Sequence, residues 1–399
     1  MNISGLKYNY DDVSIVPDVM TNIRHRKECS CYTSEGLSPI WASPMDTVIS
    51  KDNWRVFSDA GINVVLPRNI DFEDRISLCY DFAEDEKNSK FVAFSLNETK
   101  KIFRTKNKIS IYLSNVVGSD IQGDSQTQPE KMFRICIDVA NGHMKEQIDL
   151  ITAIKKKYGE CVKIMGGNIA NPNTYKLYDE AGCDYLRVGI AGGFGCLTGS
   201  NTGVFYPLFS LIKDTYFIKK KIGGKCKIIA DGGIKGFRDV QKALIYADYV
   251  MIGSLFNKAI ESAAKTTYGS FYWNIRGMKI YRPLKSLLYY GKEVPKEKYD
   301  SAIELIKQNK LSVWKEFYGM STKKAQANII EGNGGYVSHE KLKTSEGKVA
   351  YQKVEYSVKG WMRNEMDYLC SAMSYTNSRT LDEYKESGWV TENQIKYNK

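Results

Sequence analysis

Short apolar runs alternate with amphipathic helical stretches along the chain from about residue 37 to residue 255. The pattern predicts seven strands, at residues 62–66, 91–94, 133–137, 162–165, 185–188, 227–230 and 249–252. Helices are expected between them, for example over residues 148–157, 173–181 and 237–246. Strands that alternate with helices at this spacing form parallel βαβ units. Seven or eight such units in one chain favour a closed α/β barrel, the (β/α)8 TIM barrel, over an open sheet.

Polar or glycine-rich turns follow most of the later predicted strands. They lie at residues 138–142, 166–168, 189–195, 231–233 and 253–254. In a barrel, all these turns gather on the C-terminal face, and glycine lets the backbone approach a ligand closely. The turns with Asp231, Gly232 and Gly233 and with Gly253 and Ser254 follow the last two predicted strands. Barrels commonly bind phosphate there through backbone N–H groups, so the sequence predicts a phosphate site.

The pattern changes after residue 255. Residues 265–315 are rich in Tyr, Trp and Lys and include a predicted helix at residues 296–307, so they are expected to form an insertion. Residues 332–348 contain glycine and polar residues, a composition that suits a mobile flap near the C-terminal face. We expect residues 1–399 to form one catalytic barrel domain with these two additions.

Composition narrows the classes of partner. No apolar run approaches the ~20 residues that span a bilayer, and the N-terminus lacks a signal-peptide pattern, so we expect a cytoplasmic protein with no membrane partner. The net charge is +11 at pH 7, but the lysines are scattered and no basic run contains interleaved aromatic residues. Lys219, Lys220 and Lys221 are expected to be a solvated helix end rather than a nucleic-acid site. A basic surface also suits a phosphorylated small molecule.

The cysteines and histidines argue against a structural metal site. The nine cysteines include no CxxC pair and the three histidines lack ligand spacing, so reduced cytosolic thiols are expected and a zinc site is not. One cysteine stands apart, because Cys196 lies in a glycine-rich loop directly after a predicted strand, with Thr198 two residues on. A thiol at such a strand end suits a nucleophile, and the alternative is a surface loop that carries a stray cysteine.

Several short motifs in a fixed order resemble the IMP dehydrogenase/GMP reductase family of (β/α)8 barrels. The resemblance runs over most of the chain and implies the fold independently of the hydrophobic pattern. The motifs are DDV with Pro17, SPMDTV at 43–48, GGN at 166–168, AGCD at 181–184, RVG at 187–189, the loop with Cys196 and Thr198, DGGI at 231–234, GSL at 253–255, GMS at 319–321 and SEGK at 345–348.

Four features resemble the reductase branch of this family more than the dehydrogenase branch. Three are motifs: DVANG at 138–142, TGVFYP at 202–207, and FYGMS at 317–321 with TSEGK at 344–348. The fourth is the flap, because dehydrogenases carry an Arg-Tyr pair there, whereas no arginine lies between Met320 and Glu346. The chain also has no room for the regulatory CBS domain that many dehydrogenases insert. Three alternatives stay open: an IMP dehydrogenase, a related barrel that acts on a modified purine nucleotide, and a non-catalytic purine-nucleotide-binding protein.

The resemblance implies reductive deamination of GMP to IMP and ammonia with NADPH. Cys196 would attack C2 of the purine, and Thr198 would relay a proton with Glu346. The implied nucleotide contacts are Asp231, Gly232, Gly233, Gly253, Ser254, Gly319, Met320, Ser321, Ser345 and Gly347. The implied cofactor contacts are Asp138, Val139, Ala140, Gly189, Lys343, Ser371 and Ser374.

The family also binds potassium through main-chain carbonyls, which here are those of Ala191, Gly193 and Cys196, and it usually forms homotetramers. Ser371 to Ser374 would reach a neighbouring subunit's cofactor. The basic cluster Arg24 to Lys27 is either a contact for the 2′-phosphate of NADPH or a solvated loop.

The chain departs from the family at three kinds of position. Gly199 and Lys343 stand where relatives usually have arginine, and lysine keeps the charge but loses the planar fork. Ala191 replaces a usual glycine, which strains the loop if a positive φ is required there. The insertion of residues 265–315 is expected to reshape the site, mediate assembly, or accommodate a modified purine nucleotide.

Overall fold

Eight parallel strands close into a barrel in the computed structural model, which describes residues 5–83, 89–119, 131–275, 278–283, 296–338, 342–387 and 390–392. The barrel closes because β2 pairs with both β3 and β9. The predicted (β/α)8 TIM barrel is therefore confirmed. Its strands, in order around the barrel, are β2 (Ile40–Ala42), β3 (Asn63–Leu66), β4 (Lys90–Phe94), β5 (Phe133–Ile137), β6 (Val162–Ile169), β7 (Tyr185–Val188), β8 (Lys227–Asp231) and β9 (Tyr249–Ile252).

Seven of these strands lie where the apolar runs predict them, and two details differ. Strand β2 went unpredicted because it has three residues, all buried, and is too short to show a periodic pattern. Strand β6 continues through the GGN turn to Ile169, and its register with β7 shifts between Gly167 and Ile169. The predicted turn at residues 166–168 is therefore the irregular end of a strand rather than a separate loop.

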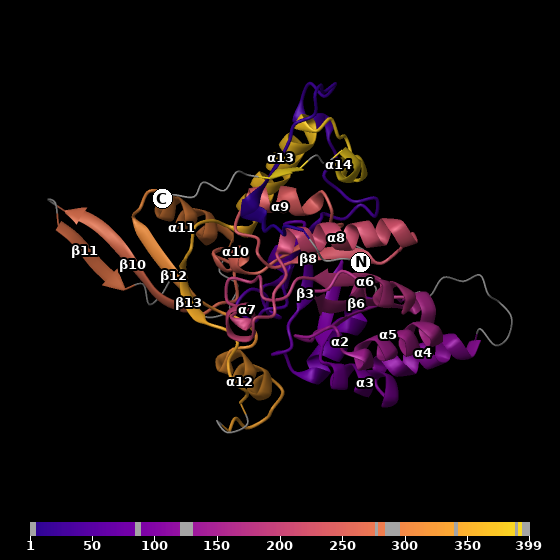
Figure 1. Cartoon of the computed structure of the whole chain (residues 1–399). Coiled ribbons are helices and arrows are strands. Elements are labelled where there is room, and N and C mark those ends of the chain that lie inside the picture. The colour runs from indigo at the N-terminus through magenta and orange to yellow at the C-terminus, as the bar shows by residue number, and fades with distance from the viewer. Residues whose placement is uncertain are drawn as a thin grey trace.

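Helices surround the barrel, as Figure 1 shows. Their apolar faces and the outer faces of the strands form the main hydrophobic core, which includes Phe57, Phe94, Tyr175 and Phe256. The helices between the strands and after β9 are α1 (Trp54–Asp59), α2 (Phe72–Phe82), α3 (Leu96–Arg104), α4 (Lys108–Ser119), α5 (Lys145–Tyr158), α6 (Thr174–Glu180), α7 (Thr198–Thr202), α8 (Leu208–Ile222), α9 (Phe237–Leu244) and α10 (Ser254–Asn257).

An antiparallel sheet stands beside the barrel and contains the residues expected to form an insertion. Its order is β11 (Met278–Pro283), β10 (Thr266–Ile275), β12 (Leu311–Tyr318) and β13 (Val349–Lys353). Helix α11 (Lys296–Lys307) matches the predicted helix, and Ile303 and Ile306 pack with Leu311 and Val313 in a small core. Strand β13 follows the flap in sequence, so this sheet joins the two sides of the flap (Figure 1).

The C-terminal residues return to the N-terminal segment. Helix α13 (Val358–Tyr375) packs on the turn η2 (Arg26–Glu28) and on α9, helix α14 (Leu381–Ser387) follows it, and β14 (Val390–Glu392) pairs with β1 (Val13–Ile15). A disulfide bond joins Cys31 to Cys370. The expectation that every thiol is reduced is wrong for this pair, because their 339-residue separation hides a contact that only the folded chain makes.

Among the residues described, no helix combines the length and the apolar composition needed to cross a bilayer.

Trp41 fills the interior of the barrel and gives a test of its packing. Its side chain is fully buried, and its ring meets Phe91, Tyr185 and Tyr249 edge to face at centroid distances of 5.5, 5.9 and 6.0 Å. Replacing Trp41 by Ala should lower the free energy of unfolding by about 3–5 kcal/mol in urea denaturation, because it leaves a large cavity.

The exposed Val19 provides the control, since Val19→Ala should change the free energy of unfolding by less than about 0.5 kcal/mol. A Trp41→Ala variant as stable as Val19→Ala would show that the barrel interior is not packed around this ring.

Candidate active site

Cys196 lies in the loop that follows β7, at the C-terminal face of the barrel. Its thiol is half-buried, and helix α7 begins two residues later at Thr198. Gly189, the first residue of the loop, has a φ of 146°, and a β-carbon there would overlap the carbonyl of Asp231. The loop therefore passes tightly over the end of β8, a path that favours glycine.

The end of the flap pairs with this loop as a short antiparallel bridge between Cys196 and Gly347. The Leu197 N–H donates to the Glu346 carbonyl at 2.6 Å, and the Lys348 N–H donates to the Gly195 carbonyl at 3.0 Å. Backbone bonds on both sides of Gly347 thus fix the flap end against the cysteine loop.

Three side chains form a hydrogen-bonded series across this bridge. The Cys196 thiol donates to the Thr198 hydroxyl, with Sγ and Oγ1 3.3 Å apart. The Thr198 hydroxyl donates in turn to the Glu346 carboxylate at 2.6 Å. A hydroxyl held between a thiol and a carboxylate can pass a proton from one side to the other.

The GMS turn comes close to the same loop from the end of β12. A β-carbon on Gly319 would lie 2.7 Å from the Gly195 carbonyl oxygen, and one on Gly347 would lie 3.2 Å from the Ser321 hydroxyl. Met320 and Ser321 are half-buried at this junction, and the Ser345 hydroxyl donates to the Gly347 carbonyl at 2.8 Å. The cysteine loop, the GMS turn and the SEGK segment therefore meet.

The two predicted phosphate turns lie side by side at the ends of β8 and β9, which are neighbours in the barrel. Gly232 and Gly233 have φ values of 103° and 72°, and a β-carbon on Gly233 would overlap the Leu208 side chain. Gly253 precedes α10, which begins at Ser254. Their backbone N–H groups are thus exposed to a common region of the C-terminal face, an arrangement suited to an anion.

Asp231 ends β8 within a network of buried charges. The Asn168 amide donates to its carboxylate at 2.7 Å, and Arg187 lies 3.9 Å away. Burial raises the pKa of Asp231, while Arg187 and the hydrogen bond from Asn168 partly oppose that rise. Arg187 also donates to Asp138 at 2.8 Å, so one nearly buried guanidinium orients the carboxylates at the ends of β5 and β8.

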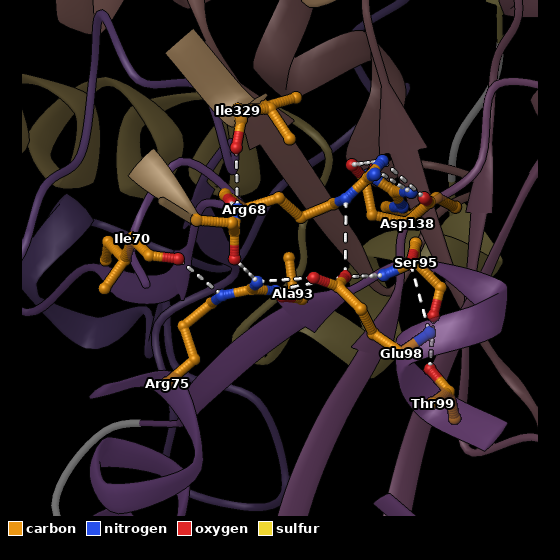
Figure 2. A network of polar contacts seen from close by, with 11 residues as sticks. Arg68, Ile70, Arg75, Ala93, Ser95, Glu98, Thr99, Asp138 and Ile329 are labelled. Carbon is orange, nitrogen blue, oxygen red and sulfur yellow. Dashed lines mark hydrogen bonds and ion pairs between the residues drawn. The ribbon is translucent and has the colours of Figure 1, made fainter. Parts of the chain in front are cut away.

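Asp138 also faces Arg68, at the end of β3, and Figure 2 shows the polar network that contains both residues. The Arg68 guanidinium lies 3.8 Å from the Asp138 carboxylate and 3.9 Å from that of Glu98. Burial pushes the pKa of Glu98 upward, but its bonds with Arg75 and Ser95 outweigh burial and lower the pKa below its usual value. Glu98 therefore stays ionised between the two arginines.

The other implied cofactor residues fall into two groups. Val139 and Ala140 follow Asp138 in the turn after β5, and Lys343 lies at the flap end near Glu346. Ser371 and Ser374 lie on α13, and the Ser374 carbonyl accepts from Thr21 at 2.9 Å. Helix α13 stands well apart from α7 in Figure 1, so this chain does not bring the two serines to its own cysteine loop.

The basic cluster at Arg24 to Lys27 lies beside α13. Arg26 is 3.7 Å from Asp367, and the His25 ring caps η2 by accepting from the Lys27 N–H. The cluster therefore lies against the helix that carries the two serines, and Figure 1 shows this helix well apart from α7.

The carbonyls of Ala191, Gly193 and Cys196 lie in the cysteine loop. The Gly193 carbonyl accepts the Cys196 N–H at 3.0 Å, which makes a tight turn and leaves a second lone pair on the oxygen. Ala191 adopts a φ of 65°, so the position does require the left-handed backbone that glycine usually supplies. Among the described residues, no group of three His, Cys, Asp or Glu side chains could hold a metal ion.

Sequence reasoning missed three residues that hold the site together. Arg187 and Asn168 were recognised only as parts of motifs, and Arg68 was not singled out at all. Their pairing with Asp138 and Asp231 depends on strands that are adjacent in the barrel but separated in sequence. The one available signal was Arg187 itself, because a charged residue within an otherwise apolar strand indicates a buried ion pair.

A separate hollow of about 680 Å³ opens at the N-terminal end of the barrel, opposite the cysteine loop. Its charged residues are largely paired, since Lys155 and Lys163 lie 3.1 and 3.0 Å from Asp184. Lys227 lies 3.8 Å from Glu35 across the same hollow. Cys196 and its hydrogen-bonded partners lie at the other end, so we place the candidate site there.

The fold and the cysteine-bearing loop at its C-terminal face place the protein among the (β/α)8 barrels. A family model described as "IMP dehydrogenase / GMP reductase domain" matches residues 7–307. The chain belongs to this family, whose members are oxidoreductases that use a nicotinamide cofactor.

The curated relatives of the chain include proteins named inosine-5'-monophosphate dehydrogenase and a protein named GMP reductase. Inosine-5'-monophosphate dehydrogenase of Bacillus subtilis (strain 168) is 32% identical over 212 residues, 51% of this chain and 42% of that protein. The same-named protein of Staphylococcus aureus (strain Mu50) is 31% identical over 277 residues, 68% of this chain and 48% of its own. GMP reductase of Chromobacterium violaceum is 29% identical over 261 residues, 64% of this chain and 73% of its own. The chain thus spans less than half of these dehydrogenases.

Ala191 provides a test of strain in the cysteine loop. Replacing it by Gly should leave the free energy of unfolding unchanged or raise it by up to about 1 kcal/mol, because relief of the left-handed strain offsets the added freedom of the unfolded chain. The control is Ala372→Gly within α13, which should lower the free energy of unfolding by about 1 kcal/mol. Equal destabilisation of the two variants in urea denaturation would argue against strain at Ala191.

Proposed function

We propose that the protein is a GMP reductase, which converts GMP to IMP and ammonia with NADPH. The observation that carries the proposal is the series from Cys196 through Thr198 to Glu346, in a flap without the arginine that dehydrogenases use. The balanced reaction is GMP + NADPH + 2 H⁺ → IMP + NH4⁺ + NADP⁺.

In the proposed mechanism, the Cys196 thiolate adds to C2 of the purine and forms a tetrahedral adduct. The thiol proton of Cys196 would pass through the Thr198 hydroxyl to Glu346. Glu346 would then return it through Thr198 to the exocyclic amine, which leaves only after it gains a proton. Ammonia loss leaves a thioimidate on Cys196. Asp138, Val139 and Ala140 would hold a nicotinamide cofactor, which would supply hydride to C2, and the Cys196 thiolate would then depart as IMP forms.

The residues around the series support binding of the nucleotide. The turns at Gly232–Gly233 and Gly253–Ser254 would hold the 5′-phosphate through backbone N–H groups, and Asp231 would accept from the ribose hydroxyls. Gly319, Met320, Ser321, Ser345 and Gly347 would surround the base. Asp138, with Val139, Ala140 and Gly189, would line the nicotinamide side.

We extend the proposal to a potassium ion on the carbonyls of Ala191, Gly193 and Cys196, and to a homotetramer in which Ser371 and Ser374 serve a neighbouring subunit's cofactor. The separation of α13 from the cysteine loop within one chain favours a role for these serines in another subunit.

The second candidate function is that of an IMP dehydrogenase, since several relatives have that name. It uses the same thiol attack, but water must then be activated in the flap. A non-catalytic nucleotide-binding protein is disfavoured, because binding alone does not need the connected thiol, hydroxyl and carboxylate.

One pair of assays separates these functions. The protein should consume NADPH in the presence of GMP, seen as a loss of absorbance, and should not reduce NAD⁺ in the presence of IMP. Turnover in the second assay alone would make the protein a dehydrogenase.

Substitutions in the series give a further test. Cys196→Ala should abolish turnover while leaving GMP affinity within about threefold of wild type by calorimetry, because the phosphate and ribose contacts remain. Glu346→Gln should lower kcat by about 10²-fold or more, since it removes the relay carboxylate without changing its size. If the Cys196→Ala protein still turns over GMP, a covalent mechanism is untenable.

A further inference from the structure

Gln326, on helix α12 (Lys323–Gly332), makes three hydrogen bonds that join the flap to the GMS turn. Its Oε1 accepts the Lys343 N–H at 2.8 Å, and its Nε2 donates to the Lys343 carbonyl at 3.2 Å. The same Nε2 donates to the Ser321 carbonyl at 3.2 Å. The amide thus holds the backbone of Lys343 at both its donor and its acceptor, as a neighbouring strand would.

Helix α12 is a firm support for this contact, because its side chains fasten it to the barrel rim. The Asn328 amide donates to the buried Asp46 carboxylate at 2.9 Å and to the Tyr318 hydroxyl at 2.7 Å. The Thr322 side chain caps the helix by accepting from the Ala325 N–H. Asp46 follows β2 and Tyr318 ends β12, so Asn328 joins the helix to both the barrel and the second sheet.

The C-terminal end of α12 is fastened by Asn333, next to the network in Figure 2. The Asn333 amide donates to the carbonyls of Ile329 and Arg68 at 2.7 and 3.1 Å, and its oxygen accepts from Arg75 at 2.9 Å. Arg75 is fully buried and is held by Glu98 at 2.6 Å. A buried, paired guanidinium has little freedom, so the start of the flap is fixed to the barrel.

Asn333 therefore ties the start of the flap to the barrel, and Gln326 holds the flap at Lys343, three residues before Glu346. Beyond Lys343, the backbone bonds of Leu197 and Gly195 receive the flap end. Without the Gln326 amide, these later bonds would hold the flap end alone and would open more often.

We propose that Gln326 is a positioning residue that fixes the flap at Lys343 so that the Glu346 carboxylate meets the Thr198 hydroxyl. The inference deepens the proposed function and rests on it for its kinetic consequence. Gln326 acts through Glu346 and makes no contact with Cys196 or Thr198 among the hydrogen bonds of the described residues. Because its Nε2 also holds Ser321, one side chain sets the flap end relative to the base-binding turn.

The variant Gln326→Leu keeps the size of the side chain and removes all three hydrogen bonds. We expect kcat for GMP reduction to fall about tenfold or more, with KM for GMP within about twofold of wild type, because the phosphate turns are untouched. Gln308→Leu is the matched control. Gln308 is an exposed amide one residue past α11, and its side chain bonds only Glu304 on that helix among the contacts of the described residues. It should leave both constants unchanged.

A double substitution separates positioning from general damage. If Gln326 acts through Glu346, adding Gln326→Leu to Glu346→Gln should cost no more than about twofold beyond Glu346→Gln alone. Losses that multiply in the double variant, or a Gln326→Leu enzyme with wild-type kcat, would overturn the proposal.

Hydrogen exchange tests the same contact without any turnover. In the free protein, Gln326→Leu should speed exchange of the Lys343, Leu197 and Lys348 amides, whereas peptides from β7 and β8 should exchange as in wild type. Unchanged exchange at these three amides would refute the positioning role, even if the protein reduces GMP. Faster exchange in a protein that does not reduce GMP would support the role of Gln326 and reject the proposed function alone.

Discussion

The hydrogen bond from the Thr198 hydroxyl to the Glu346 carboxylate joins parts of the chain that are 148 residues apart, and the candidate site is arranged around it. One partner begins α7 in a loop of the barrel, and the other arrives on the flap. A hydrogen bond of 2.6 Å between these two side chains requires accurate placement of both backbones. The bridge between Cys196 and Gly347 positions the chain after Glu346. Helix α12 positions the chain before it, through the hydrogen bonds of Gln326 with Lys343.

The sheet beside the barrel supplies much of this placement. The GMS turn follows β12, and β13 begins directly after Lys348. All of β13 pairs with residues Trp314–Tyr318 of β12. Residues 265–315 therefore contribute to the support of the flap, because β10 pairs with β12 and extends the sheet that holds both sides of the flap. Burying Arg75 beneath α12 is costly unless its hydrogen bonds are satisfied, and Glu98, Asn333 and two backbone carbonyls satisfy them.

The barrel was largely predictable from the sequence because parallel strands buried on both faces read as continuous apolar runs. Strand β2 was not predicted because three residues carry no period. Strands β10, β11 and β12 were not predicted because the mixed aromatic and basic residues of 265–315 suggested only an insertion, and β13, beyond that segment, was not predicted either. The series from Cys196 to Glu346 was expected from motif resemblance rather than from any local pattern. Gln326 and Asn333 were not expected at all, since a polar residue on an amphipathic helix usually faces solvent, and only the folded chain shows what each amide contacts.

The most direct test of the central claim follows the fate of the exocyclic amine. Wild-type protein is supplied with NADPH and with GMP that carries ¹⁵N in its 2-amino group, and labelled ammonia and IMP are measured in a single turnover. The proposed relay predicts equal amounts of labelled ammonia and IMP, with both formed at least about a hundredfold more slowly by Glu346→Gln. Labelled ammonia released at the same rate by the Glu346→Gln protein would contradict the account, as would a wild-type protein that releases none.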